Sequence, residues 1–123
     1  MYWVRRTWIM LAALSGALGV MAGAYGAHGV ADPLARHWLE IGAEYQMIHA
    51  LTAVVSVSVT NRRSPLAPAL FIAGTVLFSG TLYGMALGAP HWLGAVTPMG
   101  GLLFLAGWAA LAWEARKIDR SPG

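Results

Sequence analysis

The length of its apolar stretches is the feature that most constrains how this chain can fold. Four such stretches lie at about 8–27, 44–60, 68–87 and 93–113, and all but the second lack a charged side chain. A helix needs about 20 predominantly apolar residues to cross about 30 Å of hydrocarbon. The pattern therefore predicts an all-α, polytopic membrane protein with four transmembrane helices.

The composition supports this class and excludes several others. Of 123 residues, 58% are hydrophobic and 11% charged, whereas soluble domains carry about 25% charged residues. A soluble domain of this size has too little interior to bury so much apolar surface. The chain has no cysteine, which excludes disulfides, thiolate metal sites and cysteine nucleophiles. The net charge is +3, but the few basic residues lie between the apolar stretches, so we expect no nucleic-acid partner.

Small residues recur through the first stretch at alternating steps of four and three: Ala12, Gly16, Gly19, Gly23 and Gly26. This spacing forms one narrow face against which a neighbouring helix can pack closely. The alternative interpretation is a cleaved signal peptide, because a basic segment precedes the stretch and Ala22–Ala24 has the form of a cleavage site. We favour a retained first span, because the apolar run is long for a signal peptide and its small residues follow a packing period.

A turn at His28–Pro33 separates the first stretch from an amphipathic segment. Asp32 and Pro33 are typical of an N-cap followed by the first helical residue. The apolar Leu34 and Trp38 fall on one helical face, while the charged residues Arg36, Glu40 and Glu44 line another. This pattern predicts a short interfacial helix at 33–43. It would continue directly, or with a bend near Gly42, into the second span.

Glycines also recur in the last two spans. In the third, glycine stands at every fourth position over 80–88. In the fourth, the expected packing face contains Phe104 and Leu111 together with two glycines. The glycines that we predict at helix contacts are Gly16, Gly19, Gly23, Gly80, Gly84, Gly88, Gly100 and Gly107. We see no linker or second domain, so residues 1–123 should form a single membrane domain with a soluble tail at 114–123.

The distribution of basic residues predicts the orientation. With four spans, both termini and the 61–65 turn lie on one side of the membrane. That side holds Arg5, Arg6, Arg62, Arg63, Arg116, Lys117 and Arg120, and the other side holds only Arg36. Because positive charge is retained in the cytoplasm, both termini should be cytoplasmic.

Candidate functional residues gather at the start of the second span. They form a polar cluster of His28, Glu44, Tyr45, Gln46 and His49. A titratable residue at the depth of His49 is costly unless it faces protein or water. We expect it to hydrogen-bond a carbonyl or hydroxyl of a neighbouring helix, close to His28. Glu44 lies about 140° from His49 around the helix, so the two cannot be metal ligands on one face.

Several functions are compatible with these residues. Because no catalytic, cofactor or metal motif is present, we expect a non-catalytic accessory or structural subunit. Its partners would be the lipid bilayer and another membrane protein, or a second copy of the chain. An alternative is an oligomeric transporter or channel for a small solute, an ion or protons, lined by Tyr45, His49, Thr52 and Ser56. A third is a metal or haem protein with His28 and His49 as ligands.

Four segments in order also resemble a known family. They are GAYGAHG at 23–29, W-x-x-x-G-x-E-Y-Q-x-x-H at 38–49, GTVLFSGTLY at 74–83 and TPMGGLLFLAGWA at 97–109. Together they resemble the YgdD / transmembrane protein 256 family of small membrane proteins of unknown function. The resemblance implies a four-span helical protein in the bacterial inner membrane, or in the mitochondrial membrane for eukaryotic relatives. It implies no activity and no site residues.

Overall fold

The structure, a computed structural model, describes residues 2–59 and 65–119. Over these residues the secondary structure is helical, which confirms the predicted all-α class. The elements are α1 (Tyr2–His28), α2 (Pro33–Val59), α3 (Leu66–Ala86), the short 3-10 helix η1 (His91–Ala95) and α4 (Thr97–Ala115). Most of the 61–65 turn and the end of the tail lie outside the described residues.

Local sequence accounts for the helix boundaries. The Asp32 carboxylate accepts a hydrogen bond of 3.0 Å from the backbone N–H of Ala35, which confirms the predicted N-cap of α2. Helix α4 begins at Thr97 with Pro98 in its first turn, where the missing proline N–H costs nothing. Gly88 lies in the connection between α3 and η1 and has a φ of 105°, a conformation that favours glycine.

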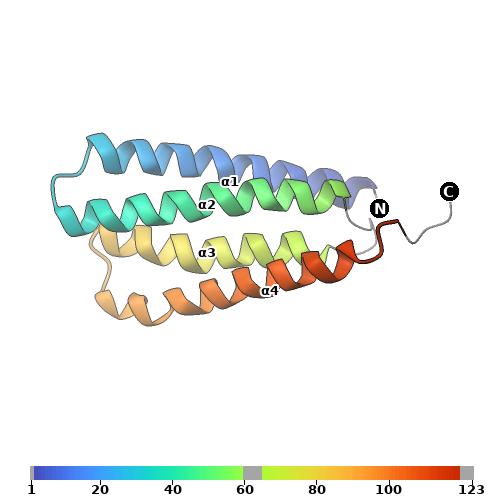
Figure 1. Cartoon of the computed structure of the whole chain (residues 1–123). Coiled ribbons are helices and arrows are strands. Elements are labelled where there is room, and N and C mark those ends of the chain that lie inside the picture. The colour runs from blue at the N-terminus through green and yellow to red at the C-terminus, as the bar shows by residue number, and fades with distance from the viewer. Residues whose placement is uncertain (1, 60–64, 120–123) are drawn as a thin grey trace.

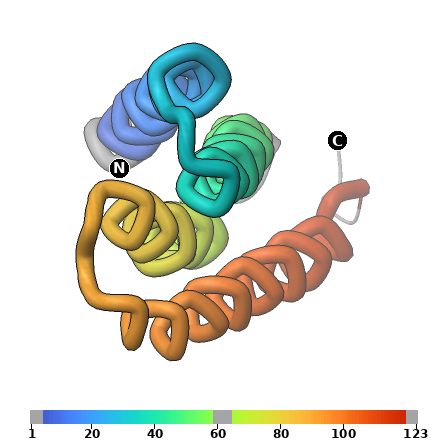
Figure 2. The backbone as a smooth tube through the Cα atoms, turned by 90° about the vertical axis from the view of Figure 1, so that its left-hand side faces the viewer, coloured from blue at the N-terminus to red at the C-terminus, as the bar shows by residue number. Residues whose placement is uncertain are grey.

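Consecutive helices run antiparallel and lie side by side (Figure 1). Helix α2 packs against α1 and α3, and α3 packs against α2 and α4. Helices α1 and α3 make only slight contact, as do α2 and α4. Within the described residues, the backbones of α1 and α4 are not in contact. The four helices therefore form an open, folded layer with α1 and α4 at its edges, rather than a closed bundle (Figure 2).

The helix predicted at 33–43 continues directly into the second span, which is one of the two forms expected from the sequence. Pro33–Val59 is one continuous helix, and its first half packs along α1. Ala35, Leu39 and Ala43 are 7%, 3% and 2% exposed, and Leu39 and Ala43 face Gly26 and Gly23 of α1. No proline or turn separates this stripe from the rest of α2.

At most of the predicted contact positions, a glycine leaves room for an atom of the neighbouring helix. In α1, the positions of Gly16, Gly19 and Gly23 face Ala50, Met47 and Ala43 of α2. Helices α3 and α4 each place a phenylalanine against a glycine of the other: Phe104 lies against Gly74, and Phe71 lies against Gly107. Gly100 faces the backbone of α3 so closely that an added Cβ would lie 2.8 Å from the Gly74 carbonyl oxygen.

Three of the predicted contact glycines, all in or just after α3, do not face another long helix. Gly80 and Gly88 would place a Cβ in open space, and Gly84 faces Leu93 and Ala89 of the following connection. The every-fourth-residue ladder of α3 therefore does not form a contact between helices of this chain. Gly80 instead lines the space between α3 and α1, two helices that make only slight contact.

Within the described residues, three helical segments are long and apolar enough to cross a membrane: Arg5–His28, Leu66–Ala86 and His91–Ala115. Helix α2 is not among them. Its first half carries Arg36, Glu40 and Glu44, which lower its hydropathy. This helix is nevertheless flanked by α1 and α3 along its length (Figure 1).

Candidate functional site

His49 occupies the middle of α2 and is 4% exposed. Its Nδ1 lies 2.8 Å from the Tyr45 carbonyl oxygen, and its Nε2 lies 3.1 Å from Nε1 of Trp108 in α4. A carbonyl only accepts hydrogen bonds and an indole N–H only donates them. His49 therefore carries its proton on Nδ1 and accepts at Nε2, which is the neutral form of the ring.

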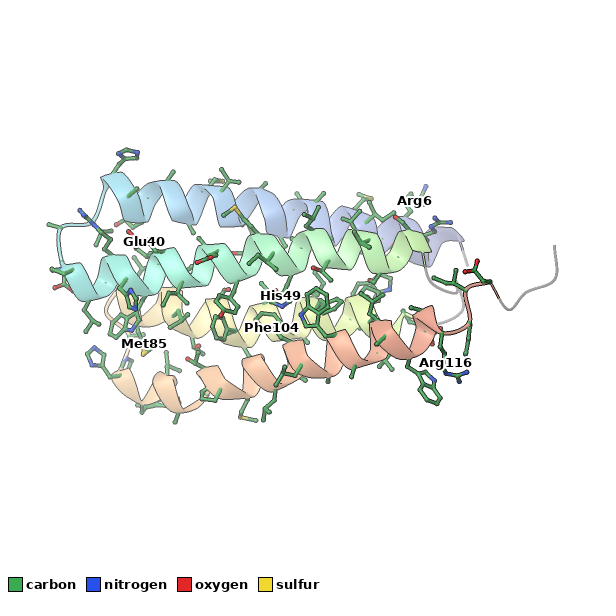
Figure 3. All side chains as sticks on the ribbon, in the orientation of Figure 1. Arg6, Glu40, His49, Met85, Phe104 and Arg116 are labelled. Atoms are coloured by element: carbon green, nitrogen blue, oxygen red, sulfur yellow. The ribbon has the colours of Figure 1, made fainter. Side chains whose placement is uncertain are left out.

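Aromatic rings from three helices surround His49. The ring of Phe104 stacks on the imidazole with a centroid distance of 3.6 Å and an interplanar angle of 4°. Phe71 lies 5.7 Å away and the indole of Trp108 6.0 Å away, nearly perpendicular. Figure 3 shows His49 and Phe104 together at the centre of the molecule. The polar ring is thus satisfied and enclosed, as the sequence interpretation expected, but by an indole rather than a carbonyl or hydroxyl of a neighbouring helix.

A groove of about 310 Å³ opens between α2 and α4 beside this cluster. Aromatic residues form much of its wall, and Glu44 also lines it. Tyr45 is 40% and Trp108 43% exposed, while His49 lies at the buried end. Glu44 and His49 reach the same groove despite their separation around the helix, because one lies at its exposed edge and the other deep within it.

Gln46 lies on the other side of α2, in a hydrogen-bonded chain that joins three helices. Its side-chain N–H donates to the Ser15 hydroxyl at 3.2 Å, and its carbonyl oxygen accepts from the Tyr83 hydroxyl at 2.6 Å. Nearby, the Ser79 hydroxyl donates to the Gly42 carbonyl oxygen at 2.7 Å. These bonds tie α1, α2 and α3 together at one level.

A second, larger groove lies between α1 and α3 and has a volume of about 810 Å³. The hydrogen-bonded side chains of Ser15, Gln46, Ser79 and Tyr83 form its floor. Its walls are largely apolar and include Leu14, Leu18 and Met21 of α1 and Val76 of α3. These four side chains are 56% to 64% exposed. The groove exists because α1 and α3 are held apart by α2 and scarcely contact each other.

The structure divides the predicted polar cluster into three places. Glu44, Tyr45 and His49 line the groove between α2 and α4, whereas Gln46 lines the groove between α1 and α3. His28 is exposed at the end of α1. Because Gly16 faces Ala50, His28 and His49 lie about 16 Å apart along the helix axes at 1.5 Å per residue. The two histidines therefore cannot share a ligand, and the hypothesis of a joint metal or haem site is wrong.

The four residues predicted to line a channel do not lie along one groove: Tyr45, His49, Thr52 and Ser56. Thr52 donates to the Ile48 carbonyl at 2.7 Å and Ser56 to the Ala53 carbonyl at 2.8 Å. Both side chains are buried, and neither lines either groove. Hydroxyl groups in helices commonly bond their own backbone in this way.

The residues of these sites that were absent from the predicted cluster include Tyr83, Phe104 and Trp108. Phe104 was assigned to a packing face only, and Trp108 adjoins that face at a helical step of four. Tyr83 follows Ser79 by the same step. These spacings indicate shared faces, but no local pattern indicates which helix each face meets.

Comparison with known proteins places the chain in a family. Residues 22–101 match the model of a protein family of unknown function, DUF423. The chain belongs to the DUF423 family. No solved structure matches it.

Full-length relatives of the DUF423 chain bear the family name UPF0382. A UPF0382 membrane protein of Haemophilus influenzae is 38% identical over 93% of this chain and 97% of the relative. One from Staphylococcus epidermidis is 39% identical over 92% of this chain and 98% of the relative. The UPF0382 inner membrane protein YgdD of Escherichia coli is 38% identical over 94% of this chain and 93% of the relative. These relatives confirm the resemblance to YgdD and the membrane class, and they indicate no catalytic family.

Proposed function

We propose that this protein is a non-catalytic membrane subunit that binds a transmembrane helix of another membrane protein in the groove between α1 and α3. In this proposal all four helices cross the bacterial inner membrane and both termini lie in the cytoplasm. The argument has three parts: the orientation, the chemistry of the groove floor and the open surface of α3.

The described charges support this orientation. Arg6 and Arg116 lie at one end of the helical layer and Glu40 nearer the other (Figure 3). Arg5, at the same end as Arg6, donates to the Ser58 carbonyl at the end of α2 at 3.4 Å. Retention of positive charge in the cytoplasm then favours termini on the inner side. Because α2 is packed between α1 and α3 along its length, it would cross the membrane with them despite its charges.

The polar floor of the groove is the observation that carries the proposal. The bonds of Ser15 and Gln46 leave the serine hydroxyl proton and the second amide N–H without an acceptor among the described residues. Ser15 and Gln46 stand at the middle of α1 and α2. Lipid tails at that depth offer no hydrogen-bond acceptor. A partner helix can supply one through a Ser, Thr, Asn or Gln side chain.

The α3 wall of the groove is suited to such a helix. Gly80 lines the groove and has open space where a Cβ would stand. A missing side chain at this position allows a second helix to approach the α3 backbone closely, as small residues do in membrane helix pairs.

Photo-crosslinking in intact cells tests this proposal. A photoreactive side chain at Val76, which lines the groove, should yield one discrete protein adduct. The same group at Leu102, which is 65% exposed on α4, should yield none. Gly80→Leu should fill the groove and remove both the adduct and co-purification in mild detergent, while Leu102→Trp should leave them intact. Equal adducts from both positions, or an adduct unaffected by Gly80→Leu, would contradict the proposal.

A further inference from the structure

Glu44 places a carboxylate within the apolar layer of the molecule. The hydrogen bond from Ser79 to the Gly42 carbonyl puts those two residues at one level. Counted from Ala86, the last residue of α3, the Glu44 backbone then lies about 13 Å inside the end of that helix at 1.5 Å per residue. Since α3 is 21 residues long, or about 31 Å, Glu44 lies well inside the span.

Among the residues that the structure describes, none supplies a counter-charge to this carboxylate. Over residues 2–59 and 65–119, the ion pair present is Lys117–Glu114. Glu44 makes no hydrogen bond to another described residue. Arg36, on the same helix, instead donates two hydrogen bonds to the Val30 carbonyl at 2.9 and 3.2 Å. Both nitrogens of His49 are also engaged, so this ring supplies no cation. An ionisable group at such a depth is costly without a partner and generally marks a functional position.

The groove beside Glu44 has walls that suit a cation. Tyr45 and Phe78 lie with ring centroids 4.8 Å apart and an interplanar angle of 40°. Phe78 and Phe104 lie 5.4 Å apart at 54°, and Trp108 completes the wall. The faces of aromatic rings carry partial negative charge and attract ammonium groups. At about 310 Å³, the groove falls at the small end of the range for small-molecule sites.

We propose that the groove between α2 and α4 binds a compact organic ammonium ion, with Glu44 as its counter-charge and Tyr45, Phe78 and Trp108 as its aromatic walls. A bare metal ion fits less well, because cations such as Mg²⁺ and Ca²⁺ require several oxygen ligands. Glu44 supplies the one carboxylate of this groove. This inference does not depend on helix binding at the groove between α1 and α3.

Direct binding of benzyltrimethylammonium to the full chain tests this inference. The protein is placed in nanodiscs of zwitterionic lipid, and binding is measured by equilibrium dialysis against empty nanodiscs. Glu44→Gln should weaken binding at least tenfold. Glu40→Gln is the matched control, because Glu40 is exposed one turn earlier on α2 and lies outside the groove. Size-exclusion chromatography establishes that each variant remains folded, which is expected because both carboxylates are exposed.

Two further measurements separate charge from shape. The neutral isostere neopentylbenzene should compete at least tenfold more weakly than the cation. Tyr45→Leu should weaken cation binding at least threefold, while Trp113→Leu, which alters an exposed indole outside the groove, should not. Absence of binding to the wild-type chain, equal binding by Glu44→Gln, or equal competition by the isostere would each overturn the proposal. So would a crosslink from Glu44 to a basic residue of a partner protein without cation binding, which would assign the carboxylate to a protein interface.

Discussion

The indole N–H of Trp108 donates a hydrogen bond of 3.1 Å to Nε2 of His49, across two helices that otherwise scarcely approach each other. This bond and the one to the Tyr45 carbonyl together define the Nδ1-protonated tautomer of the imidazole. They also seat Trp108 at the wall of the groove that contains Glu44. One hydrogen bond thus links the burial of His49 to the shape of the candidate cation site.

We predict that Trp108→Phe lowers the free energy of unfolding by about 1 kcal/mol, because it leaves the buried Nε2 without a donor. Nitrogen NMR of the wild-type chain should show the Nδ1-protonated tautomer of His49, and the Nε2 resonance should shift in the variant. Trp113→Phe is the control, since this indole is 60% exposed. An Nε2-protonated ring in the wild-type chain would contradict the assignment.

A second prediction concerns the contact between α3 and α4. Gly100→Ala should destabilise the protein by about 1–3 kcal/mol, because its Cβ would meet backbone atoms of Gly74 and Phe78. Backbone cannot rotate away as a side chain can, so the helices must separate. Unfolding in mixed micelles with increasing SDS gives the measurement.

Its neighbour Gly101 is the matched control, because an added Cβ there meets no atom within 4 Å. Gly101→Ala should therefore leave stability unchanged or raise it slightly, since alanine is the better helix former. Equal destabilisation by the two variants would show that the α3–α4 interface differs from the one described.

A third prediction concerns the hydrogen bond between Tyr83 and Gln46. A double-mutant cycle with Tyr83→Phe and Gln46→Leu should give a coupling energy of about 0.5–1.7 kcal/mol, the range of hydrogen bonds between membrane helices. The two residues lie on α3 and α2, 2.6 Å apart at their polar atoms. Additive effects of the two substitutions would indicate that the bond contributes nothing to helix association. Tyr83→Phe with Ser58→Ala serves as a comparison, because the Ser58 hydroxyl donates to the Val54 carbonyl of its own helix.

A fourth prediction tests the orientation and uses the absence of cysteine from the chain. Single cysteines at Ala31 and Ala89, in the connections at one end of the layer, should react with a membrane-impermeant maleimide added outside spheroplasts. A cysteine at Ala115, at the end of α4, should react only after the membrane is opened. Labelling of Ala115→Cys from outside would reverse the proposed topology.

The sequence predicted the helical elements well because their determinants are local. The apolar runs require helices in lipid, since a helix satisfies its own backbone hydrogen bonds. Asp32 and Thr97-Pro98 then mark helix starts through contacts within one turn. The burial of His49 was expected for a similar reason: a polar ring at that depth must meet protein.

The partners of those helices could not be predicted in the same way. A glycine step of four has the same form whether a helix packs on it, as at Gly19, or nothing does, as at Gly80. The helix at 33–43 was predicted from its charged and apolar faces, but its packing of Leu39 and Ala43 against Gly26 and Gly23 of α1 was not. Each outcome depends on a surface supplied by another part of the chain.

Hydropathy, helix caps and the basic ends are properties of neighbouring residues, so the amino-acid sequence alone specifies a helical membrane protein of this family. Other features arise instead from the relative rotation and spacing of four helices. Gln46 and His49 line different grooves, and Trp108 contacts His49 from another helix. That arrangement minimises the free energy of packing over the whole molecule, through contacts between residues distant in the chain. No local window of sequence contains both sides of such a contact.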